Sequence, residues 1–353
     1  MKIAFLNDTH CGVRNSADIF IDYQQRFYEE IFFPYLIEND IKRIIHLGDY
    51  FDHRKYINFK ALNSNRKHFL DKLREYGIHM DIIAGNHDVY YKNTNELCSL
   101  KELMGWYTDC VNIVKEPSVI DYDGVDIALI PWINNENYHD SIKFIENCKA
   151  SFLGAHLELE NFEMMKGVTN THGMSAKHFK GFEQVWSGHF HTKSQRDNIM
   201  YLGSQMEFTW ADCDDQKHFH VFDTSTREMT PVKNPLTLFM RVVYNDSINN
   251  YLDYDTDVLK GKYVKIVVDK KEDAFAFERF VDLVQNASPA ELKIAETFDE
   301  FTGENVDGEN ISVEDTTTLL DSYVDAVDTD LDKDKIKSLM RNLYVEASNL
   351  EII

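Results

Sequence analysis

Five short apolar runs in this chain each end in side chains that can bind a metal ion. Such runs, rich in Ile, Val and aromatic residues, are typical of buried strands. Polar side chains that follow parallel strands collect at one edge of a sheet, where α/β folds place their chemistry. The pattern therefore restricts the chain to a fold in which several strands end at a common site. The runs are Ile3–Leu6 before Asn7-Asp8-Thr9-His10, Ile44–Leu47 before Gly48-Asp49-Tyr50-Phe51-Asp52, Met80–Ala84 before Gly85-Asn86-His87-Asp88, Phe152–Ala155 before His156, and Val185–Trp186 before Ser187-Gly188-His189-Phe190-His191.

Longer amphipathic stretches lie between these runs. In Asp18–Glu38 and Lys60–Tyr76 the apolar residues recur at helical spacing, which indicates helices with one buried face. Further apolar runs at Val125–Trp132 and Phe219–Phe222 extend the alternation of strands and helices. This alternation predicts an α/β layer fold with a largely buried sheet.

A smaller unit of different character follows Pro231–Pro235. Strands are predicted at Thr237–Tyr244, Tyr263–Val268 and Leu292–Phe298, with a helix at Asp273–Asn286. Together these elements predict a small second α+β unit.

The last part of the chain is predicted to form a linker and two helices. Asp299–Ser312 is polar and lacks strong periodicity, as is typical of a linker. Glu314–Val327 and Lys335–Leu350 each place apolar residues on one side, with Ser312 and Asp332 as candidate N-caps. The apolar sides could pack on their own domain or against a partner, and the sequence alone favours neither.

The chain is strongly acidic, with 37 Lys and Arg against 60 Asp and Glu and a formal net charge of −23. This balance excludes a protein that holds nucleic acid through its overall positive charge. The charge is uneven: Glu296–Asp334 has fourteen acidic residues against Lys333, whereas His53–Arg74 has seven basic residues against Asp71. A charge run usually marks a solvated face, but the basic run starts beside the predicted metal ligands.

The five cysteines include no C-x-x-C pair. They are expected to be reduced thiols in a cytoplasmic protein, not a disulfide framework or a zinc knuckle. No run of about 18 apolar residues predicts a membrane span, and the N-terminus lacks the pattern of a signal peptide.

The residues at the strand ends form a consistent set of metal ligands. Each motif alone is weak evidence, because a D-x-H or H-x-H pair more often has a structural role. Together they supply two aspartates, one asparagine and four histidines, all oxygen or nitrogen donors. The lack of cysteine disfavours a structural zinc site, and seven ligands exceed what one open catalytic metal takes. The set suits two ions that share a carboxylate.

In their order, D-x-H, G-D-x-x-D, G-N-H-D, a lone histidine after a strand and G-H-x-H resemble the motifs of the calcineurin-like metallophosphoesterases. Within that superfamily the chain looks most like the SbcD-type nucleases of DNA double-strand-break repair, and among these like the recombination endonuclease subunit of T-even-like phages. The finer resemblance is carried by Tyr91-Lys92-Asn93, Leu129-Ile130-Pro131-Trp132, Val185-Trp186-Ser187-Gly188-His189-Phe190-His191-Thr192, the small cap and Leu343-Tyr344-Val345-Glu346-Ala347.

The resemblance implies a two-sheet α-β-β-α metallophosphoesterase sandwich with a small α+β cap and a C-terminal helical pair. It implies a nuclease domain at 1–232, a DNA-binding cap at 233–298, a flexible acidic linker at 299–312 and the helical pair at 313–353.

It also implies a role for each matching residue. One metal ion would have as ligands Asp8, His10, Asp49 and His191. The other would share Asp49 as a bridge and add Asn86, His156 and His189. His87 would donate a proton to the leaving oxygen, and Asp52 would orient His87 by accepting its other N–H.

The implied activity is a metal-dependent DNA nuclease that processes DNA ends for recombination and repair, as a double-strand exonuclease with single-strand endonuclease activity. The ligand set favours two Mn²⁺ ions, with Mg²⁺ as the alternative, and these ions would supply the positive charge that the acidic chain lacks. Contacts to DNA are expected from Arg54, Lys55, Lys60, Arg66, Lys67, Lys92 and His172.

In such nucleases a helical pair after a linker grips the coiled coil of an SbcC-type ATPase. The expected anchors here are Leu320, Tyr323, Val324, Leu339, Met340 and Leu343. The resemblance also implies a homodimer through Asp18–Glu38 or Lys60–Tyr76. The expected location is the cytoplasm, which is the host cytoplasm if a phage encodes the chain.

Three other functions compete with this one. A phosphomonoesterase or protein phosphatase shares the metal core, but Ser/Thr phosphatases carry Glu where Asp88 stands and Arg where His53 stands. A non-catalytic subunit that bridges an ATPase to DNA ends would have no use for seven ligands and His87. An acidic DNA mimic ranks last, because the strong acidity is confined to the linker and tail.

Overall fold

The computed structural model describes residues 1–165, 168–296, 324 and 332–349. The chain divides into two compact units, Met1–Met240 and Arg241–Ile353, which we call unit 1 and unit 2. None of the helices in the described part of the chain is long and apolar enough to cross a membrane.

Unit 1 contains a six-stranded sheet whose central strands are parallel. Its strands lie in the order β14, β13, β1, β2, β3, β4. The pairs β1–β2, β2–β3 and β3–β4 are parallel, while β13 runs antiparallel to both β1 and β14. The bounds are β1 Lys2–Leu6, β2 Arg43–His46, β3 His79–Ile83, β4 Val111–Val114, β13 His218–Asp223 and β14 Glu228–Lys233.

A second six-stranded sheet of unit 1 has the order β11, β12, β10, β7, β6, β5. The strands β12, β10, β7 and β6 are parallel, and the edge strands β5 and β11 are antiparallel to their neighbours. The bounds are β5 Ser118–Tyr122, β6 Val125–Ile130, β7 Phe152–His156, β10 Gln184–Gly188, β11 Ser194–Arg196 and β12 Ile199–Tyr201.

The two sheets pack face to face through one apolar core. Ile3 and Phe5 of β1 belong to the same buried cluster as Ile127 of β6 and Phe152 of β7. The indole of Trp186 in β10 stacks on Phe152 with ring centroids 5.1 Å apart and meets Phe5 edge-on at 5.0 Å. This aromatic contact fixes the first sheet against the second.

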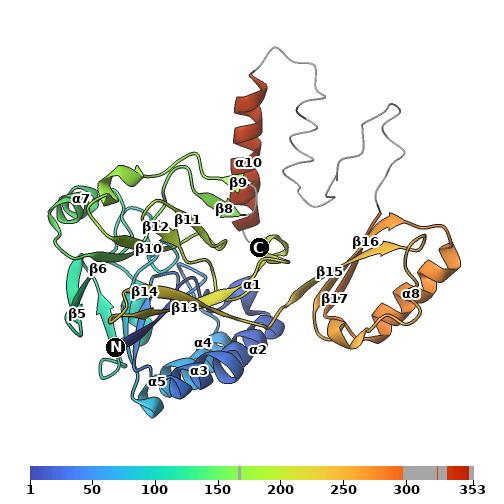
Figure 1. Cartoon of the computed structure of the whole chain (residues 1–353), viewed down its shortest axis with the longest axis horizontal. Coiled ribbons are helices and arrows are strands. Elements are labelled where there is room, and N and C mark those ends of the chain that lie inside the picture. The colour runs from blue at the N-terminus through green and yellow to red at the C-terminus, as the bar shows by residue number, and fades with distance from the viewer. Residues whose placement is uncertain (166–167, 297–323, 325–331, 350–353) are drawn as a thin grey trace. The chain divides into compact units, whose positions relative to one another are not determined.

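Helices cover the outer face of each sheet. Figure 1 shows α2, α3, α4 and α5 along one side of unit 1. On that side Phe32 meets Phe219 of β13 edge-on, with centroids 5.1 Å apart. On the second sheet, Ile145 of α7 and Phe179 of η3 join a separate buried cluster with Leu153 of β7. The bounds are α2 Asp18–Arg26, η1 Phe27–Phe32, α3 Phe33–Glu38, α4 Phe59–Asn65, η2 Arg66–Leu70, α5 Asp71–Tyr76, α7 Tyr138–Asn147 and η3 Ala176–Phe179.

The remaining elements of unit 1 are short. They are α1 Val13–Ser16, α6 Ser99–Met104, the pair β8 Glu163–Met165 and β9 Val168–Thr169, and η4 Trp210–Asp212.

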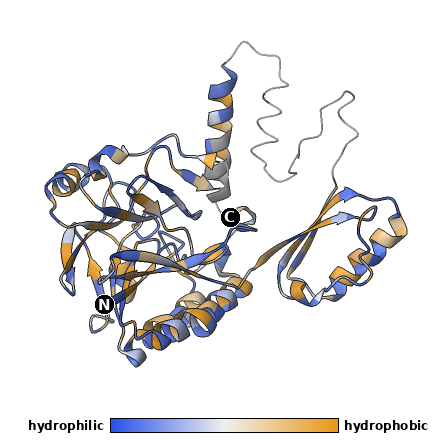
Figure 2. Ribbon diagram, in the orientation of Figure 1, coloured by the Kyte–Doolittle hydropathy of each residue, from blue (hydrophilic) through white to orange (hydrophobic). Residues whose placement is uncertain are grey.

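Unit 2 is built on a small sheet with the order β15, β16, β17, of which the first strand begins in unit 1. Phe277 and Phe280 of α8 pack on the Tyr244 ring of β15, with centroids 4.9 and 5.4 Å away. Asp273 caps α8 by accepting hydrogen bonds from two main-chain N–H groups of its first turn. Figure 2 shows hydrophobic and hydrophilic residues alternating along this helix. The bounds are β15 Phe239–Asn245, η5 Asp257–Leu259, β16 Tyr263–Lys270, α8 Ala274–Asn286, β17 Glu291–Glu296 and α10 Lys333–Asn349.

The predicted fold class, a two-sheet α-β-β-α sandwich with a small α+β cap, is confirmed. The second predicted tail helix corresponds to α10, and Asp332 caps it through a 3.3 Å hydrogen bond from the Lys335 N–H. The predicted linker at 299–312 lies outside the described residues, as does the first tail helix except Val324. The predicted domain boundaries stay predictions.

Candidate metal centre

Strand ends from both sheets bring all seven predicted ligands to one edge of unit 1. Main-chain hydrogen bonds tie the first loops together: Asp8 N–H donates to Gly48 O at 2.9 Å and His10 N–H to Asp49 O at 3.1 Å. The ligands are Asp8 and His10 after β1, Asp49 after β2, Asn86 after β3, His156 at the end of β7, and His189 and His191 after β10.

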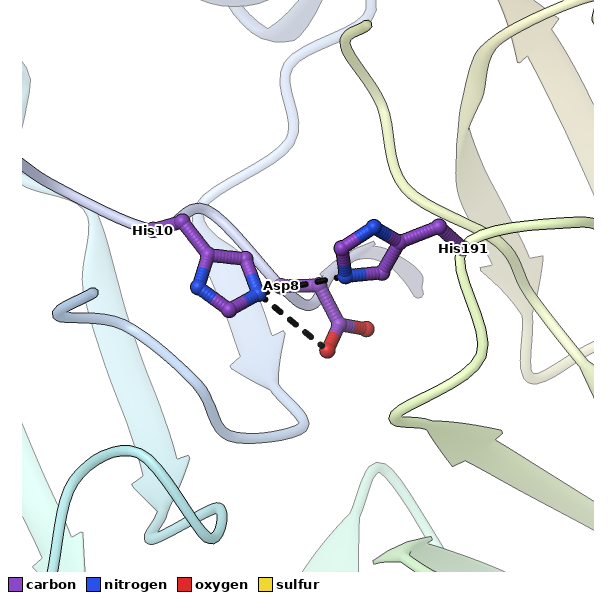
Figure 3. A group of neighbouring side chains, drawn as sticks. All are labelled: Asp8, His10 and His191. Atoms are coloured by element: carbon purple, nitrogen blue, oxygen red, sulfur yellow. Dashed lines mark hydrogen bonds and ion pairs between the residues drawn. The ribbon is translucent and has the colours of Figure 1, made fainter. Parts of the chain in front are cut away.

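Asp8, His10 and His191 form the first ligand group. One side-chain donor atom from each residue lies within 4.8 Å of the other two. Figure 3 shows the imidazoles of His10 and His191 facing each other beside the Asp8 carboxylate. Their Nε2 atoms are 3.2 Å apart, and His10 Nε2 is 4.0 Å from Asp8 Oδ1. Three donors thus point at one small space.

Asp49, His156 and His189 form the second ligand group by the same criterion. Asn86 joins it, because its Oδ1 lies 3.0 Å from His156 Nε2. His156 Nδ1–H donates to the Leu47 carbonyl at 2.8 Å. Since a carbonyl can only accept, this bond leaves Nε2 of the neutral ring as the metal-binding nitrogen.

Asp49 contacts both groups. Its Oδ2 is 3.3 Å from His156 Nε2 and 3.9 Å from His10 Nε2, while its Oδ1 accepts the His87 N–H at 2.7 Å. The carboxylate therefore occupies the position that a bridging ligand requires.

The backbone at the site is strained in a systematic way. Asp8, His10, Asp49 and His189 all have positive φ, at 47°, 45°, 52° and 89°. Non-glycine residues seldom adopt this region, and such strain concentrates where neighbouring structure over-determines a functional geometry. These four ligands are therefore held in an unusual backbone conformation just after the strands.

Gly85 makes the close approach of two loops possible. A Cβ at this position would lie within 2.8 Å of Asp49 Cγ, which is closer than real Cβ atoms come. Only glycine lets the loop after β3 pass this close to the carboxylate.

Hydrogen bonds behind the first group hold its ligands in place. Asn7 Nδ2 donates to Asp8 Oδ2 at 2.6 Å, and the His189 N–H donates to the same carboxylate at 3.0 and 3.1 Å. Lys217 is 3% exposed, and its ammonium donates to the His191 carbonyl at 3.0 Å and to Asp212 Oδ1 at 2.6 Å. A buried ion pair therefore anchors the His191 main chain.

Asp88 joins the loops behind the second group. Its carboxylate accepts N–H groups from Tyr50 at 3.0 Å, Phe51 at 3.1 Å and Gly85 at 2.9 Å. Burial, and next the charge of Asp49, raise the pKa of Asp88 to about 7. The residue clamps the loop after β2 to the loop after β3.

His87 lies at the open side of the site, and the structure changes its expected support. Its Nδ1–H donates to the main-chain carbonyl of Asp52 at 2.5 Å, not to the Asp52 carboxylate. That carboxylate instead lies 3.0 Å from His10 Nδ1. The expectation that the Asp52 side chain orients His87 is thus corrected: the main chain of Asp52 contacts His87, and the side chain supports His10. Any residue at position 52 would present a main-chain carbonyl. The sequence pattern therefore could not show that the main chain of Asp52 contacts His87 while its side chain contacts His10.

The carboxylates of the site change the pKa values of its histidines. Burial alone would lower the pKa of His10 and His156, but Asp52 and Asp49 respectively raise both pKa values to about 9. Burial and the neighbouring His156 lower the pKa of His189 well below its usual range. Each ligand group thus combines a carboxylate charge with an imidazole, of His10 or of His156, that binds a proton when no cation is present.

The donor set fits divalent cations. Asp8 and Asp49 are 0% and 2% exposed, and no Lys or Arg in the described residues lies within ion-pair distance of either carboxylate. Without a bound cation, these two buried carboxylates depend on protonated histidines for compensation, because burying a charge is otherwise costly. Bound cations with oxygen and nitrogen ligands would remove this cost.

The residues expected to contact DNA differ in their surroundings. Lys55, Lys67, Lys92 and His172 are exposed, while Arg54 and Arg66 are half-buried. Lys60 is exposed but pairs with Asp18 at 2.5 Å. Lys55 and Lys92 belong to the segments that directly follow Asp52 and His87, whereas Lys67 lies in η2 on the outer helices.

The residues expected to contact the ATPase are only partly described. Leu339 and Leu343 of α10 are 59% and 52% exposed, and Met340 is half-buried. Val324 is 3% exposed, so it is not an exposed anchor. Leu320 and Tyr323 lie outside the described residues.

Several supporting residues were not predicted from the sequence. Asn7 and Asp88 stand inside the quoted motifs, so their position next to the ligands was a usable signal. Lys217 lies 26 residues after His191, and an isolated lysine carries no signal of this kind. The ring of Trp132, which lies 5.6 Å from the His189 ring, belongs to a quoted motif without an assigned role.

Comparisons with known proteins show what this chain is similar to. The family model for calcineurin-like phosphoesterases matches residues 1–202. Exonuclease subunit 1 of Enterobacteria phage T4 is 33% identical over 355 residues, which cover 99% of this chain and 100% of the phage protein.

Two solved structures show weaker similarity. A novel archaeal phosphodiesterase has a TM-score of 0.34 and 14% identity, with 66% of this chain and 100% of that chain covered. The calcineurin-like phosphoesterase YfkN of Bacillus subtilis has a TM-score of 0.33 and 12% identity, with 66% and 88% covered.

Proposed function

The chain belongs to the calcineurin-like phosphoesterase family, and we propose that it is a metal-dependent DNA nuclease that processes DNA ends for recombination and repair. In this proposal it is a double-strand exonuclease with single-strand endonuclease activity. The observation that carries the proposal is the convergence of seven oxygen and nitrogen ligands in two groups that share Asp49, with His87 beside them. The similarity to a phage exonuclease subunit along the whole chain supports DNA as the substrate.

Two divalent cations, Mn²⁺ in this proposal, would supply a water activated for attack and the positive charge that a phosphodiester needs. Asp8, His10, Asp49 and His191 would hold one cation. Asp49, Asn86, His156 and His189 would hold the other. The strained left-handed turns and the clamp formed by Asp88 keep these side chains aimed at one space before any ligand arrives.

His87 would protonate the leaving oxygen. Its Nδ1–H is held by the Asp52 carbonyl, so its Nε2 is the nitrogen that exchanges a proton with substrate. Its ring meets the His10 ring edge-on with centroids 5.0 Å apart, which places it next to the first ligand group. A proton donor beside the cations suits cleavage of a diester with an alkoxide leaving group.

The test is hydrolysis of end-labelled linear duplex DNA with and without Mn²⁺, next to a phosphate monoester. We expect nucleotides to be released from the duplex and little phosphate from the monoester. The reverse result would identify a phosphomonoesterase on the same core. A protein that binds two equivalents of metal and hydrolyses neither substrate would contradict the proposed catalysis.

We also propose that the chain acts with an SbcC-type ATPase and as a homodimer in the host cytoplasm. The exposed leucines of α10 support a docking helix, because two apolar side chains one turn apart are what a coiled coil would cover. Co-expression with an SbcC-type ATPase, followed by size-exclusion chromatography, tests both associations.

A further inference from the structure

Two exposed tyrosines lie in the segments that directly follow the metal ligands. Tyr56 is 59% exposed and lies seven residues after Asp49; Tyr91 is 52% exposed and lies five residues after Asn86. Large aromatic side chains are usually covered in a folded protein, and exposed ones beside a site are candidates for binding. The metal centre and His87 do not use either residue.

A chain of contacts connects Tyr56 to the reaction site. The Tyr56 ring stacks on the imidazole of His53, with centroids 4.4 Å apart and an interplanar angle of 20°. His53 Nε2 lies 3.7 Å from Asp52 Oδ2, and the Asp52 carbonyl accepts the His87 Nδ1–H. One face of the tyrosine is thus supported by His53, which directly follows Asp52, the residue whose carbonyl contacts the proton donor.

Tyr91 is held in a similar way. Its ring meets Tyr90 edge-on at 4.7 Å, and the Lys55 ammonium lies over the Tyr90 ring, 5.7 Å from its centroid. The Tyr90 N–H donates to Leu97 O at 2.9 Å, which closes the loop that presents Tyr91. Lys55 therefore connects the segment of Tyr56 to the segment of Tyr91.

The chemistry of this aromatic strip, defined as Tyr56, Tyr90 and Tyr91 with Lys55 and Lys92, selects its ligand. The lysines suit phosphates, and the aromatic rings suit flat apolar faces. Bases inside a duplex have both faces covered by their neighbours, so only unpaired bases or a frayed end can stack on a side chain. A protein partner could pack on the aromatic rings, but it would offer no phosphate groups to the two lysines.

We propose that the aromatic strip is a binding site for unpaired nucleotides next to the scissile phosphate, in which Tyr56 and Tyr91 stack on the bases that flank the cleaved bond. This inference rests on the proposed nuclease function and deepens it. The metal centre then acts on a backbone whose adjacent bases are turned out of the helix and stacked on Tyr56 and Tyr91.

The experiment compares Tyr56→Ala, Tyr91→Ala and the conservative Tyr56→Phe in the full chain with Mn²⁺. The substrates are a single-stranded oligonucleotide, a blunt duplex, the same duplex with three mismatched terminal pairs, and bis(p-nitrophenyl) phosphate. Trp106→Ala is the matched control, because Trp106 is 82% exposed but lies before β4, at the opposite end of the strands from the metal centre.

Each alanine variant should raise KM for the single strand and the frayed duplex roughly 5- to 150-fold, the range of one lost base stack. Tyr56→Phe and Trp106→Ala should match the wild type on every substrate, and all variants should hydrolyse the small diester normally. A 2-aminopurine base near the end of the oligonucleotide should lose fluorescence on binding to the His87→Ser protein, and should lose less when Tyr56→Ala is added.

Unchanged KM values in both alanine variants, or equal losses on DNA and on the small diester, would overturn the proposal. These results differ from failure of the nuclease function itself. In that case the wild-type protein would hydrolyse the small diester and leave every DNA substrate intact.

Discussion

Asp8 and Asp49 at the metal centre are almost fully buried and held by hydrogen bonds from neighbouring loops, whereas Leu339 and Leu343 on α10 are more than half exposed. Both regions were predicted to be functional from the sequence. At the first, the chain itself supplies everything that positions the side chains. At the second, α10 supplies only exposed apolar side chains, and a partner that would cover them is not among the described residues.

This contrast gives a rule for testing the molecule. A substitution at the metal centre should change the isolated protein, because the site is complete within unit 1. A substitution on the exposed side of α10 should leave the isolated protein unchanged and matter only with a partner. The predictions below test this rule from the largest expected effect on hydrolysis to the smallest.

The largest effect is expected for Asp49→Ala. The Asp49 carboxylate contacts both ligand groups, so its loss should remove both metal ions. Loss of both metals should cost more than loss of a single general acid, which contributes at most about 10⁴-fold. Hydrolysis should therefore fall by at least that factor. Metal content by elemental analysis and nuclease rate on labelled duplex measure the two losses together.

The control for this variant is Asp121→Ala, which removes an exposed carboxylate from β5. It should retain wild-type metal content and rate. If the Asp49 variant still bound two equivalents of metal, the carboxylate would not be the bridge, and Asp8→Ala and His189→Ala would have to be compared to find which ligand is.

The next largest effect is expected for His87→Ser. The variant should keep both metals, since His87 is not among the seven ligands, and should lose about 10²–10⁴-fold in DNA hydrolysis, as expected for a missing general acid. On bis(p-nitrophenyl) phosphate the loss should be small, because p-nitrophenolate leaves without a proton.

The small diester makes this prediction specific. Equal losses on DNA and on the small diester would mean that His87 binds or stabilises the phosphate and does not protonate the leaving oxygen. A variant that retains half its activity on DNA would show that water or another side chain supplies the proton.

A smaller effect is expected for Lys217→Met, because Lys217 supports the main chain of His191, a ligand of the first group. Loss of the ammonium frees the His191 carbonyl and should weaken metal binding about 10- to 100-fold, as for other residues that support ligands. It also leaves Asp212 buried without its partner, which costs about 3–5 kcal/mol of stability. Urea unfolding and Mn²⁺ titration separate these two effects.

The double variant Lys217→Met/Asp212→Asn sharpens the result. It removes the buried unpaired charge of Asp212 and leaves only that of the more exposed Asp215, the second ion-pair partner of Lys217 at 2.9 Å, so most of the stability should recover, but the His191 main chain still lacks its anchor. Weak metal binding should therefore persist. Recovery of both properties would show that Lys217 serves only to balance the charge of Asp212.

Much of the fold could be predicted from the sequence because buried parallel strands are nearly continuous apolar runs. The runs at Ile3–Leu6 and Ile44–Leu47 correspond to β1 and β2, and the helical spacing in Lys60–Tyr76 corresponds to α4 through α5. Edge strands such as β5 and β11 were not predicted. They are short and largely exposed, so they lack a strong apolar run.

The part of the candidate site that depends on particular side chains could be predicted from the sequence. Aspartate, asparagine and histidine after successive strands identify ligands, and their order in the chain identifies the family. Supports that act through the main chain leave no such trace: the Asp52 carbonyl beside His87 and the Leu47 carbonyl beside His156 would be present with any side chain. The exposure of Tyr56 and Tyr91 beside the metal ligands also becomes visible only in the structure.

The smallest effect on hydrolysis is expected for Leu339→Glu combined with Leu343→Glu. Both positions are exposed, and glutamate is a good helix former, so α10 should stay folded. Exposed substitutions usually change stability by no more than about 0.5 kcal/mol. The isolated variant should therefore match the wild type in melting temperature, metal content and nuclease rate.

With a co-expressed SbcC-type ATPase the same variant should differ sharply. Two charges placed on the apolar side of α10 would be buried without partners in a coiled-coil interface, so the variant should no longer co-purify and should lose any ATP-stimulated digestion. Ile248→Glu is the matched control, because Ile248 is 75% exposed in unit 2 but lies outside α10. Truncation after Asn310 should act like the double variant. A lower melting temperature in either protein, or undiminished co-purification, would show that α10 packs on its own chain, and the contrast between the self-contained metal centre and a partner-dependent helix would fail.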